Sequence, residues 1–369
     1  MTQRKIIVAM SGGVDSSVAA ALLAREGHEV IGVTMRLLKG GATGFGCCGA
    51  PEDLLIAKRA AEKIGIPHYV LDFSNEFEEK VVDYFVGSYL AGETPNPCLA
   101  CNRHIKFSRL KNFATSLGAT HIATGHYARI EEEADGTRRL FESADAAKDQ
   151  SYVLYNFDQD GLAATLFPVG GTPKPMVREL ARDFHLPNAG KKDSQEICFV
   201  PNRDYRAFVR EKVADAGAPP ATARPGPIVD DSGRVVGEHQ GVAFYTVGQR
   251  SGVGGGSEGP RYVSKLDPET NTVVIGPDQS NLSGGLVADD VNWVAERPAA
   301  SFEALVKIRY RHEPAPATIE PSAGGFQVRF KEPQRAVSPG QAAVVYRWDA
   351  RREAREVLGG GKITAALSQ

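Results

Sequence analysis

The chain has 369 residues, with 43 lysines and arginines against 45 aspartates and glutamates, and a formal net charge of −2 at pH 7. This length exceeds what a single hydrophobic core usually supports, so we expect two or three domains. The near balance of charge neither indicates nor excludes a nucleic-acid partner, because a local basic surface is enough to bind one. The sequence shows neither a long apolar run nor a signal-peptide pattern. We therefore expect a cytoplasmic protein with no membrane association.

Residues 11–17 read Ser-Gly-Gly-Val-Asp-Ser-Ser. Apolar patterns predict buried strands at 5–10 and 30–36, with a helix at 16–25 between them, which indicates a parallel sheet. A strand, a glycine-rich turn and a helix start form an anion site, because backbone N–H groups approach a phosphate and the helix dipole adds positive charge. The motif is neither GxxxxGK[ST] nor GxGxxG. An ordinary strand–turn–helix capped by serine is the alternative.

Further elements follow in order. The patterns predict a strand at 68–73, a helix from about 75 to 90, a strand at 120–124 and a helix from about 175 to 185. Asp135-Gly136 between residues 128–133 and 137–142 is typical of a hairpin turn. Met35 lies at the end of the second predicted strand, where its main chain could contact the edge of an adenine base. A methionine of the hydrophobic core is the alternative.

Five cysteines in a long cytosolic chain make a poor disulfide framework and favour catalytic, redox or metal-binding roles. Pro95 and Pro97 should keep the chain extended, with a helix beginning near Cys101. A cysteine at a helix start beside basic residues favours the thiolate form. Half of a zinc site at Cys98-x-x-Cys101 is the alternative, but the sequence offers no second ligand pair to complete it.

The remaining cysteines, Cys198 and the pair Cys47 and Cys48, lead to different expectations. Cys198 lies in the segment 193–199, almost a hundred residues after Cys101, and we expect this loop to return to the same sheet edge. Cys47 and Cys48 are adjacent and point in different directions, so we expect a structural or incidental role.

From about residue 216 helical periodicity fades, and short strand-like runs alternate with turn clusters. Strands at that spacing indicate a small β domain followed by a β-barrel. We therefore expect domains at 1–200, 201–278 and 279–369. The expected strands lie at 235–236, 262–266, 273–275, 286–294, 304–310, 326–330 and 342–346.

An ordered set of segments closely resembles the tRNA-specific 2-thiouridylase family of the N-type ATP pyrophosphatases. The segments are Ser11–Ser17, Pro95–Phe107, Thr124–Arg129, Lys148–Tyr152, Asp193–Phe199 and Tyr245–Arg250. The resemblance implies an α/β N-terminal domain with a parallel sheet of the adenine-nucleotide alpha-hydrolase type, a small central domain and a C-terminal barrel. It also implies ATP-dependent 2-thiolation of the wobble uridine in tRNAs for lysine, glutamate and glutamine, with release of AMP and pyrophosphate.

The resemblance also implies roles for individual residues. Cys198 would carry a persulfide supplied by a sulfur-donor protein (a sulfur relay or a cysteine desulfurase), and Cys101 would act as the nucleophile that releases its terminal sulfur by forming a disulfide. Asp15 would help to bind Mg²⁺. The implied ATP-binding residues are Ala9, Met10, Ser11, Gly12, Gly13, Val14, Asp15, Ser16, Met35 and Gly125. The implied tRNA-binding residues are Asn96, Pro97, Cys98, His126, Lys148, Asp149, Gln150, Arg309, Tyr310 and Gln341.

Cys98 departs from the family pattern, because many relatives have aspartate there. Cys98, Cys101 and Cys198 together resemble the three-thiolate set that sulfur-transfer relatives use for a [4Fe–4S] cluster, so this mechanism stands beside the persulfide. A small-molecule adenylating ligase with the same loop and a non-catalytic nucleotide- or RNA-binding module are further alternatives. Neither of these needs paired thiols.

Overall fold

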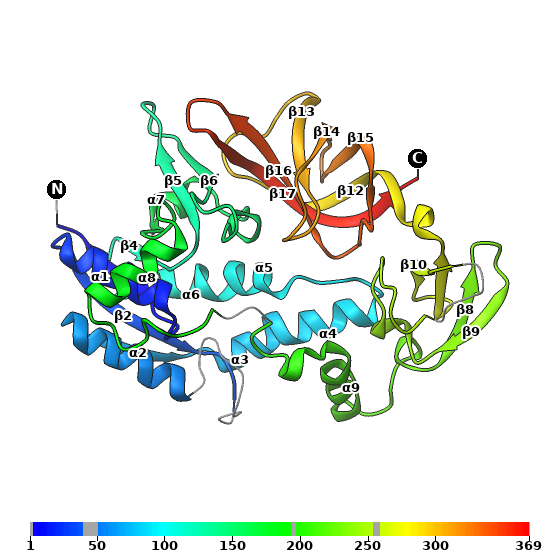
Figure 1. The fold of residues 1–369 in the computed structure, drawn as a ribbon, viewed down its shortest axis with the longest axis horizontal. Helices are drawn as coiled ribbons and strands as arrows, with labels where there is room; N and C mark the ends of the chain where they lie inside the picture. The colour runs from blue at the N-terminus through cyan, green and yellow to red at the C-terminus, as the bar shows by residue number, and fades with distance from the viewer. Residues whose placement is uncertain (1–2, 40–50, 194–196, 254–258, 369) are drawn as a thin grey trace.

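The N-terminal domain of the computed structural model is built on a parallel sheet with strand order β3-β2-β1-β4-β7 (Figure 1). The structure describes residues 3–39, 51–193, 197–253 and 259–368. Cys47 and Cys48 lie outside the described residues. The strands are β1 Lys5–Ala9, β2 Glu29–Arg36, β3 His68–Asp72, β4 His121–Ala123 and β7 Thr165–Leu166.

Both faces of this sheet are covered, which is why its central strands are apolar without alternation. Ile6 and Val8 pack on one face with α1 and α2, whereas Ile7 packs on the other with α4 and α6. The helices are α1 Val14–Arg25, α2 Pro51–Ile64, α3 Ser74–Phe77, α4 Asp83–Leu90, α5 Pro97–Cys101, α6 Ser108–Ser116, α7 Gln159–Ala163, α8 Lys174–Asp183 and α9 Tyr205–Asp215. Two π-helical segments, Glu78–Val82 and Asn102–Lys106, join α3 to α4 and α5 to α6.

The helix expected near Cys101 begins four residues earlier. Asn96 caps it, because its side-chain oxygen accepts a hydrogen bond from the Cys98 backbone N–H at 3.1 Å. Pro97 occupies the first helical position, where its missing N–H costs nothing. The expectation that Cys101 lies at a helix N-terminus is therefore wrong: Cys101 ends α5, and the chain continues as helix beyond it.

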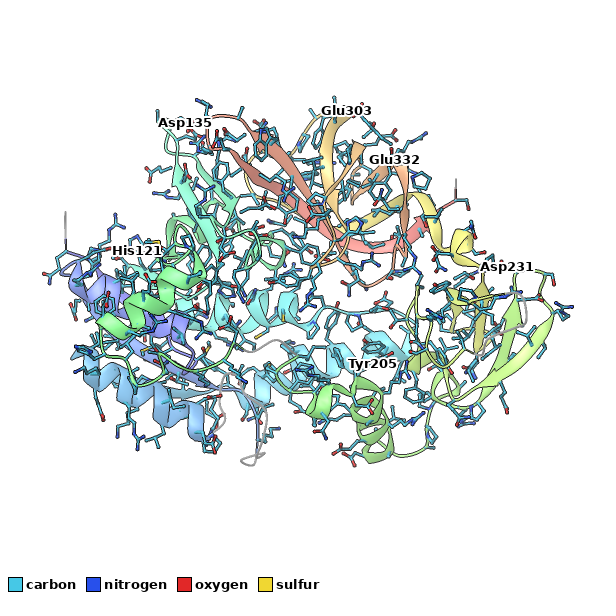
Figure 2. The ribbon with its side chains drawn as sticks, in the orientation of Figure 1. His121, Asp135, Tyr205, Asp231, Glu303 and Glu332 are labelled. Atoms are coloured by element: carbon cyan, nitrogen blue, oxygen red, sulfur yellow. The ribbon has the colours of Figure 1, made fainter. Side chains whose placement is uncertain are left out.

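The central domain is a small sheet of strand order β10-β11-β8-β9, at the right of Figure 1. It packs against the N-terminal domain through α4 and α9, which begins at Tyr205 (Figure 2). The ring of Tyr205 stacks on that of Tyr89 in α4 with centroids 4.6 Å apart. The strands are β8 Gly226–Asp230, β9 Val235–His239, β10 Tyr262–Asp267 and β11 Thr272–Gly276.

The C-terminal strands close into a barrel of order β12-β15-β14-β13-β16-β17, with β17 pairing back to β12. The expected hairpin, β5 Ala128–Glu132 and β6 Arg138–Glu142, is confirmed, with Asp135 at its tip (Figure 2). Its strand β6 pairs with β17, so a hairpin of the N-terminal domain extends the barrel sheet. The barrel strands are β12 Leu282–Trp293, β13 Phe302–Lys307, β14 Ala315–Pro321, β15 Phe326–Arg335, β16 Ala342–Asp349 and β17 Ala354–Leu367.

The barrel and the N-terminal domain also share a core, formed by the aromatic run 152–157. The Tyr152 hydroxyl donates to the Ala342 carbonyl at 2.9 Å, and the Asn292 amide donates to the carbonyls of Tyr155 and Phe157 at 2.7 and 2.8 Å. These contacts fix the barrel against the N-terminal domain. Within the described residues, no helix is long and apolar enough to cross a membrane.

Candidate functional site

The site begins at the loop between β1 and α1, which is held in shape by its own serines. The Ser16 and Ser17 hydroxyls donate to the Gly13 carbonyl at 3.2 and 3.0 Å, and the Ser11 N–H donates to Ser16 Oγ at 3.2 Å. Gly13 precedes the first turn of α1 in an extended conformation, and no side chain caps this helix start. Its first N–H groups therefore stay available to an anion.

Two glycines allow close approaches that a side chain would block. Gly12 has a φ of +74°, and a Cβ there would lie 2.5 Å from the Asp53 carbonyl oxygen. Gly125 follows β4, and a Cβ there would lie 2.6 Å from the Ser16 backbone nitrogen. The structure thus brings Gly125 against the loop, as the resemblance implies.

The remaining predicted ATP-binding residues lie at the same sheet edge. Ala9, Met10 and Met35 end strands β1 and β2 and are buried, and the Met10 carbonyl accepts a hydrogen bond from the Thr34 hydroxyl at 2.7 Å. Val14 is buried as the first residue of α1. Only their main chains can face a nucleotide in this arrangement.

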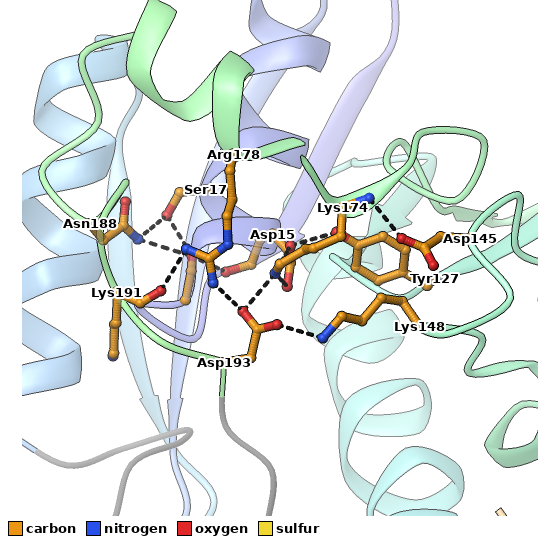
Figure 3. Close-up of polar contacts among 12 residues, drawn as sticks. Asp15, Ser17, Tyr127, Asp145, Lys148, Lys174, Arg178, Asn188, Lys191 and Asp193 are labelled. Carbon is orange, nitrogen blue, oxygen red and sulfur yellow. Dashed lines mark hydrogen bonds and ion pairs between the residues drawn. The ribbon is translucent and has the colours of Figure 1, made fainter. Parts of the chain in front are cut away.

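Residues that sequence reasoning missed support the loop from the segment after α8. The buried Asn188 amide reaches the Gly12 and Gly13 carbonyls at 3.1 and 3.0 Å and Ser17 Oγ at 3.0 Å (Figure 3). Lys191 pairs with the buried carboxylate of Asp53. Because the Asn188 amide occupies loop carbonyls, it helps to leave the loop N–H groups for an anion.

Lys174, also missed, is the most connected cation of the site. Its Nζ lies 2.6 and 2.8 Å from the two carboxylate oxygens of Asp15 and 2.9 Å from Asp193 Oδ1 (Figure 3). The Tyr127 hydroxyl donates to Asp15 Oδ1 at 2.8 Å. Burial and the neighbouring Asp15 charge raise the pKa of Tyr127, so the phenol keeps its proton.

Asp193 gathers three cations at the start of the segment that carries Cys198. Besides Lys174, its carboxylate pairs with Lys148 at 2.8 Å and Arg178 at 2.7 Å (Figure 3). Burial alone would raise the pKa of Asp193, but the hydrogen bonds from Lys148 and Lys174 outweigh it and lower the pKa to about 2. The glycine-rich loop and the cysteine segment are therefore linked through Lys174.

The side chains around the loop and the cysteines differ in how well they suit the two implied inorganic groups, Mg²⁺ and a [4Fe–4S] cluster. Mg²⁺ bound to substrate phosphates needs only one or two carboxylates, and Asp15 can supply one while it keeps Lys174, because each carboxylate oxygen can accept more than one contact. Among the described residues, no three His, Cys, Asp or Glu side chains are gathered as metal ligands. Cys98, Cys101 and Cys198 therefore do not fit a [4Fe–4S] cluster in this arrangement.

The three described cysteines have different surroundings and form no disulfide with one another. Cys101 is buried in the apolar cluster between the sheet and α4, and half-buried Cys198 packs against the same cluster. Cys98 is exposed on α5. Burial, and then the nearby Asp149 and Cys98, raise the pKa of Tyr310 on the barrel, which places Cys98 near this residue. The two cysteines thus border one large apolar cluster, and the expectation that the segment 193–199 returns to the same sheet edge stays a prediction.

Part of the predicted tRNA-binding set meets where α5 faces the barrel. The Gln341 amide donates to the Thr94 carbonyl at 2.8 Å, next to Asn96 and Pro97. Half-buried Arg309 and exposed Tyr310 follow β13 on the barrel side. These residues form one surface made from two domains.

The rest of the predicted tRNA-binding set is engaged elsewhere. His126 is buried beside Phe107 and Phe167. Asp149 is buried and accepts hydrogen bonds from Ser143 and Ser151, and Gln150 bonds the backbone of Tyr127. Lys148 pairs with Asp193. Contact of these four residues with tRNA stays a prediction, and it would require them to change partners.

Comparisons with known proteins match this three-part architecture. The chain matches the profiles described as tRNA methyl transferase HUP domain at residues 4–202, tRNA methyl transferase PRC-barrel domain at 220–277 and aminomethyltransferase beta-barrel domain at 283–363. A tRNA-specific 2-thiouridylase MnmA of Heliobacterium modesticaldum is 50% identical, over 98% of this chain and 93% of that protein. Proteins of the same name from Carboxydothermus hydrogenoformans and Geobacter metallireducens are 49% and 48% identical, over 99% and 100% of this chain and 99% and 98% of theirs.

The chain belongs to the tRNA-specific 2-thiouridylase family. The resemblance read from the motifs is therefore confirmed, and so is the α/β domain followed by two β domains. Family membership implies the use of ATP by the HUP domain. The limits of the predicted domains and the roles of single residues stay predictions.

Proposed function

We propose that this chain transfers sulfur to carbon 2 of the wobble uridine of tRNA and uses ATP to activate the uridine oxygen. The observation that carries the proposal is the bridge by Lys174 between Asp15, in the glycine-rich loop, and Asp193, at the start of the segment that carries Cys198. A nucleotide-activating loop and a thiol segment that share one lysine are suited to successive steps on one substrate. The profile's description names methyl transfer, which needs neither a pyrophosphate-releasing loop nor paired thiols.

In the first step, the uridine O2 attacks the α-phosphorus of ATP, and pyrophosphate leaves with the electron pair of the broken P–O bond. The loop N–H groups and nearby cations stabilise the charge that develops on the phosphates. Asp15 would hold Mg²⁺, which screens the phosphate charge when bound. The product is an adenylated oxygen, which is a good leaving group on carbon 2.

In the second step, sulfur replaces that oxygen. The Cys101 thiolate attacks Sγ of the Cys198 persulfide, the S–S bond breaks, and the terminal sulfur leaves with the bonding electron pair. This sulfur adds to carbon 2, and AMP departs with the C–O electron pair. A Cys101–Cys198 disulfide remains, which an external dithiol must reduce before a sulfur-donor protein reloads Cys198.

The shared cluster of Cys101 and Cys198, with Cys98 exposed outside it, favours this two-cysteine route over the cluster alternative. Cys98 instead belongs to the surface that also contains Tyr310, Asn96 and Gln341. We propose that this surface receives the tRNA, because Arg309 there adds a cation for phosphate contacts.

The test is thiolation of unmodified tRNA by the purified chain with ATP, Mg²⁺ and a persulfide donor. Cys101→Ser and Cys198→Ser should stop 2-thiouridine formation, whereas pyrophosphate release that depends on tRNA should persist, because no thiol takes part in adenylation. Cys98→Ser should retain most of the activity. A Cys98→Ser variant as inactive as the other two would contradict the two-cysteine route, and pyrophosphate release that is independent of tRNA would favour a small-molecule ligase.

A further inference from the structure

Lys174 occupies an enclosed position in front of the glycine-rich loop. It is the first residue of α8, and its side chain is only 7% exposed. Its Nζ contacts both carboxylate oxygens of Asp15 and one of Asp193, and it lies 5.7 Å from the ring centre of Tyr127. A lysine is almost never buried to this extent unless it is paired.

The place of Asp15 fixes where this ammonium group lies relative to a bound nucleotide. Asp15 belongs to the first turn of α1, at the end where the loop N–H groups are free of helical partners. A cation that pairs with the Asp15 side chain therefore lies close to the N–H groups of the loop, where a phosphate would bind. Lys148 and Arg178 surround the same place through Asp193, so three cations face two carboxylates before ATP arrives.

The hydrogen bonds of Lys174 show which contact a phosphate would replace. An ammonium group has three N–H donors, and the three carboxylate oxygens around Lys174 use all of them. An incoming phosphate oxygen must therefore displace one acceptor. The Asp193 carboxylate loses least by the exchange, because Lys148 and Arg178 still pair with it. Among the described residues, Lys174 is the one cation paired with Asp15.

We propose that Lys174 binds the β- and γ-phosphates of ATP, the pair that leaves as pyrophosphate, and that it exchanges Asp193 for them. The inference rests on the proposed function and adds to it a phosphate-binding residue from outside the glycine-rich loop. Asp15 then has two roles: its carboxylate holds Lys174 in place, and it would also help to bind Mg²⁺. Because Asp193 lies five residues before Cys198, the exchange also removes one of three ionic contacts from the start of the cysteine segment.

The test compares the dissociation constants of ATP and AMP, measured by equilibrium dialysis of the full chain with Mg²⁺. Lys174→Gln should weaken ATP binding by roughly tenfold to a hundredfold, as expected for the loss of charged hydrogen bonds, and should change AMP binding by less than about twofold. Arg182→Gln removes an exposed charge from the same helix and should leave both constants unchanged. Circular dichroism and the unfolding midpoint establish that each variant is folded.

A second variant tests the exchange without removing the lysine. Asp193→Asn eliminates the competing carboxylate and should tighten ATP binding by a few fold, with AMP binding unchanged. Unaltered ATP binding in Lys174→Gln, equal losses for ATP and AMP, or weaker ATP binding in Asp193→Asn would each overturn the inference. If the ATP-specific effects occur but the wild-type chain inserts no sulfur into tRNA, the inference on phosphate binding stands and only the proposed thiolation is wrong.

Discussion

His126 is a buried residue whose protonation should be visible in the stability of the whole chain. Its Nδ1 lies 2.7 Å from the Thr124 hydroxyl, and its ring packs beside Phe107 and Phe167. Burial, and secondarily the charge of Lys106, lowers the pKa of His126 well below 6.5. The folded protein therefore keeps this imidazole neutral in mildly acidic solution.

The consequence is a loss of stability as the pH falls. In the unfolded chain histidine has a pKa of about 6.5, so below that pH the unfolded state binds a proton that the folded state refuses. His126 should then reduce the free energy of unfolding by up to about 1.4 kcal/mol per pH unit, until the folded pKa is reached. Urea unfolding at pH 7, 6 and 5 should show a shallower decline for His126→Phe. His185→Asn, at an exposed histidine, should keep the wild-type slope, and equal slopes in all three proteins would contradict the assignment.

Single residues were predictable where their geometry is local. The glycine-rich loop is seven consecutive residues whose backbone and hydroxyls shape one another, so the sequence alone identifies it. Lys174 and Asn188 reach the same loop from more than 150 positions away. Nothing in the local pattern separates a lysine at a helix start from an ordinary solvated one, and only the folded chain shows it buried against two carboxylates.

At the scale of elements, the join between β6 and β17 holds the ATP-binding domain to the barrel. Glu356 on β17 is buried, and its carboxylate pairs with Arg139 of β6 and Arg347 of β16, each at 2.7 Å. Both arginines are partly exposed and can turn to water if this carboxylate is lost. The join thus combines backbone pairing with a carboxylate shared by three strands.

Glu356→Gln should lower the free energy of unfolding by about 1.5–3 kcal/mol, the range for hydrogen bonds to charged groups. Glu303→Gln is the matched control, because Glu303 on β13 (Figure 2) pairs with Lys331 where both side chains are more than half exposed. That change should cost less than about 1 kcal/mol. Denaturant unfolding midpoints give both values, and equal effects of the two substitutions would show that the join does not depend on Glu356.

The elements that sequence patterns missed have physical reasons. Strand β14 contains prolines at both ends of its run, and β17 contains Gly359-Gly360-Gly361, which read as strand breakers. The early start of α5 has a local signal in the sequence, because Asn96 before Pro97 is the pattern of a helix cap followed by proline at the first position. Long, regularly apolar segments such as β1 and β2 were predicted closely.

For the whole molecule, the arrangement of domains decides which chemistry is possible. The barrel lies on the N-terminal domain through β6–β17 pairing, the shared aromatic core and the ion pairs Lys362–Glu93 and Arg103–Asp290. Figure 1 shows α5 running beneath the barrel. Cys98 belongs to α5 and lies near Tyr310, which follows β13, and we propose that these residues share the surface that receives tRNA. The central claim of the proposed mechanism is that a base delivered there is activated at the ATP loop and receives sulfur from the thiol segment.

Oxygen transfer from the base to AMP tests that claim most directly. A tRNA labelled with ¹⁸O at O2 of the wobble uridine is incubated with the wild-type chain, ATP, Mg²⁺ and a persulfide donor, and the AMP is examined by mass spectrometry. Because the C–O bond of the adenylated base breaks, each sulfur inserted should place one ¹⁸O in AMP. Unlabelled AMP formed in step with 2-thiouridine would contradict activation of the uridine oxygen by ATP.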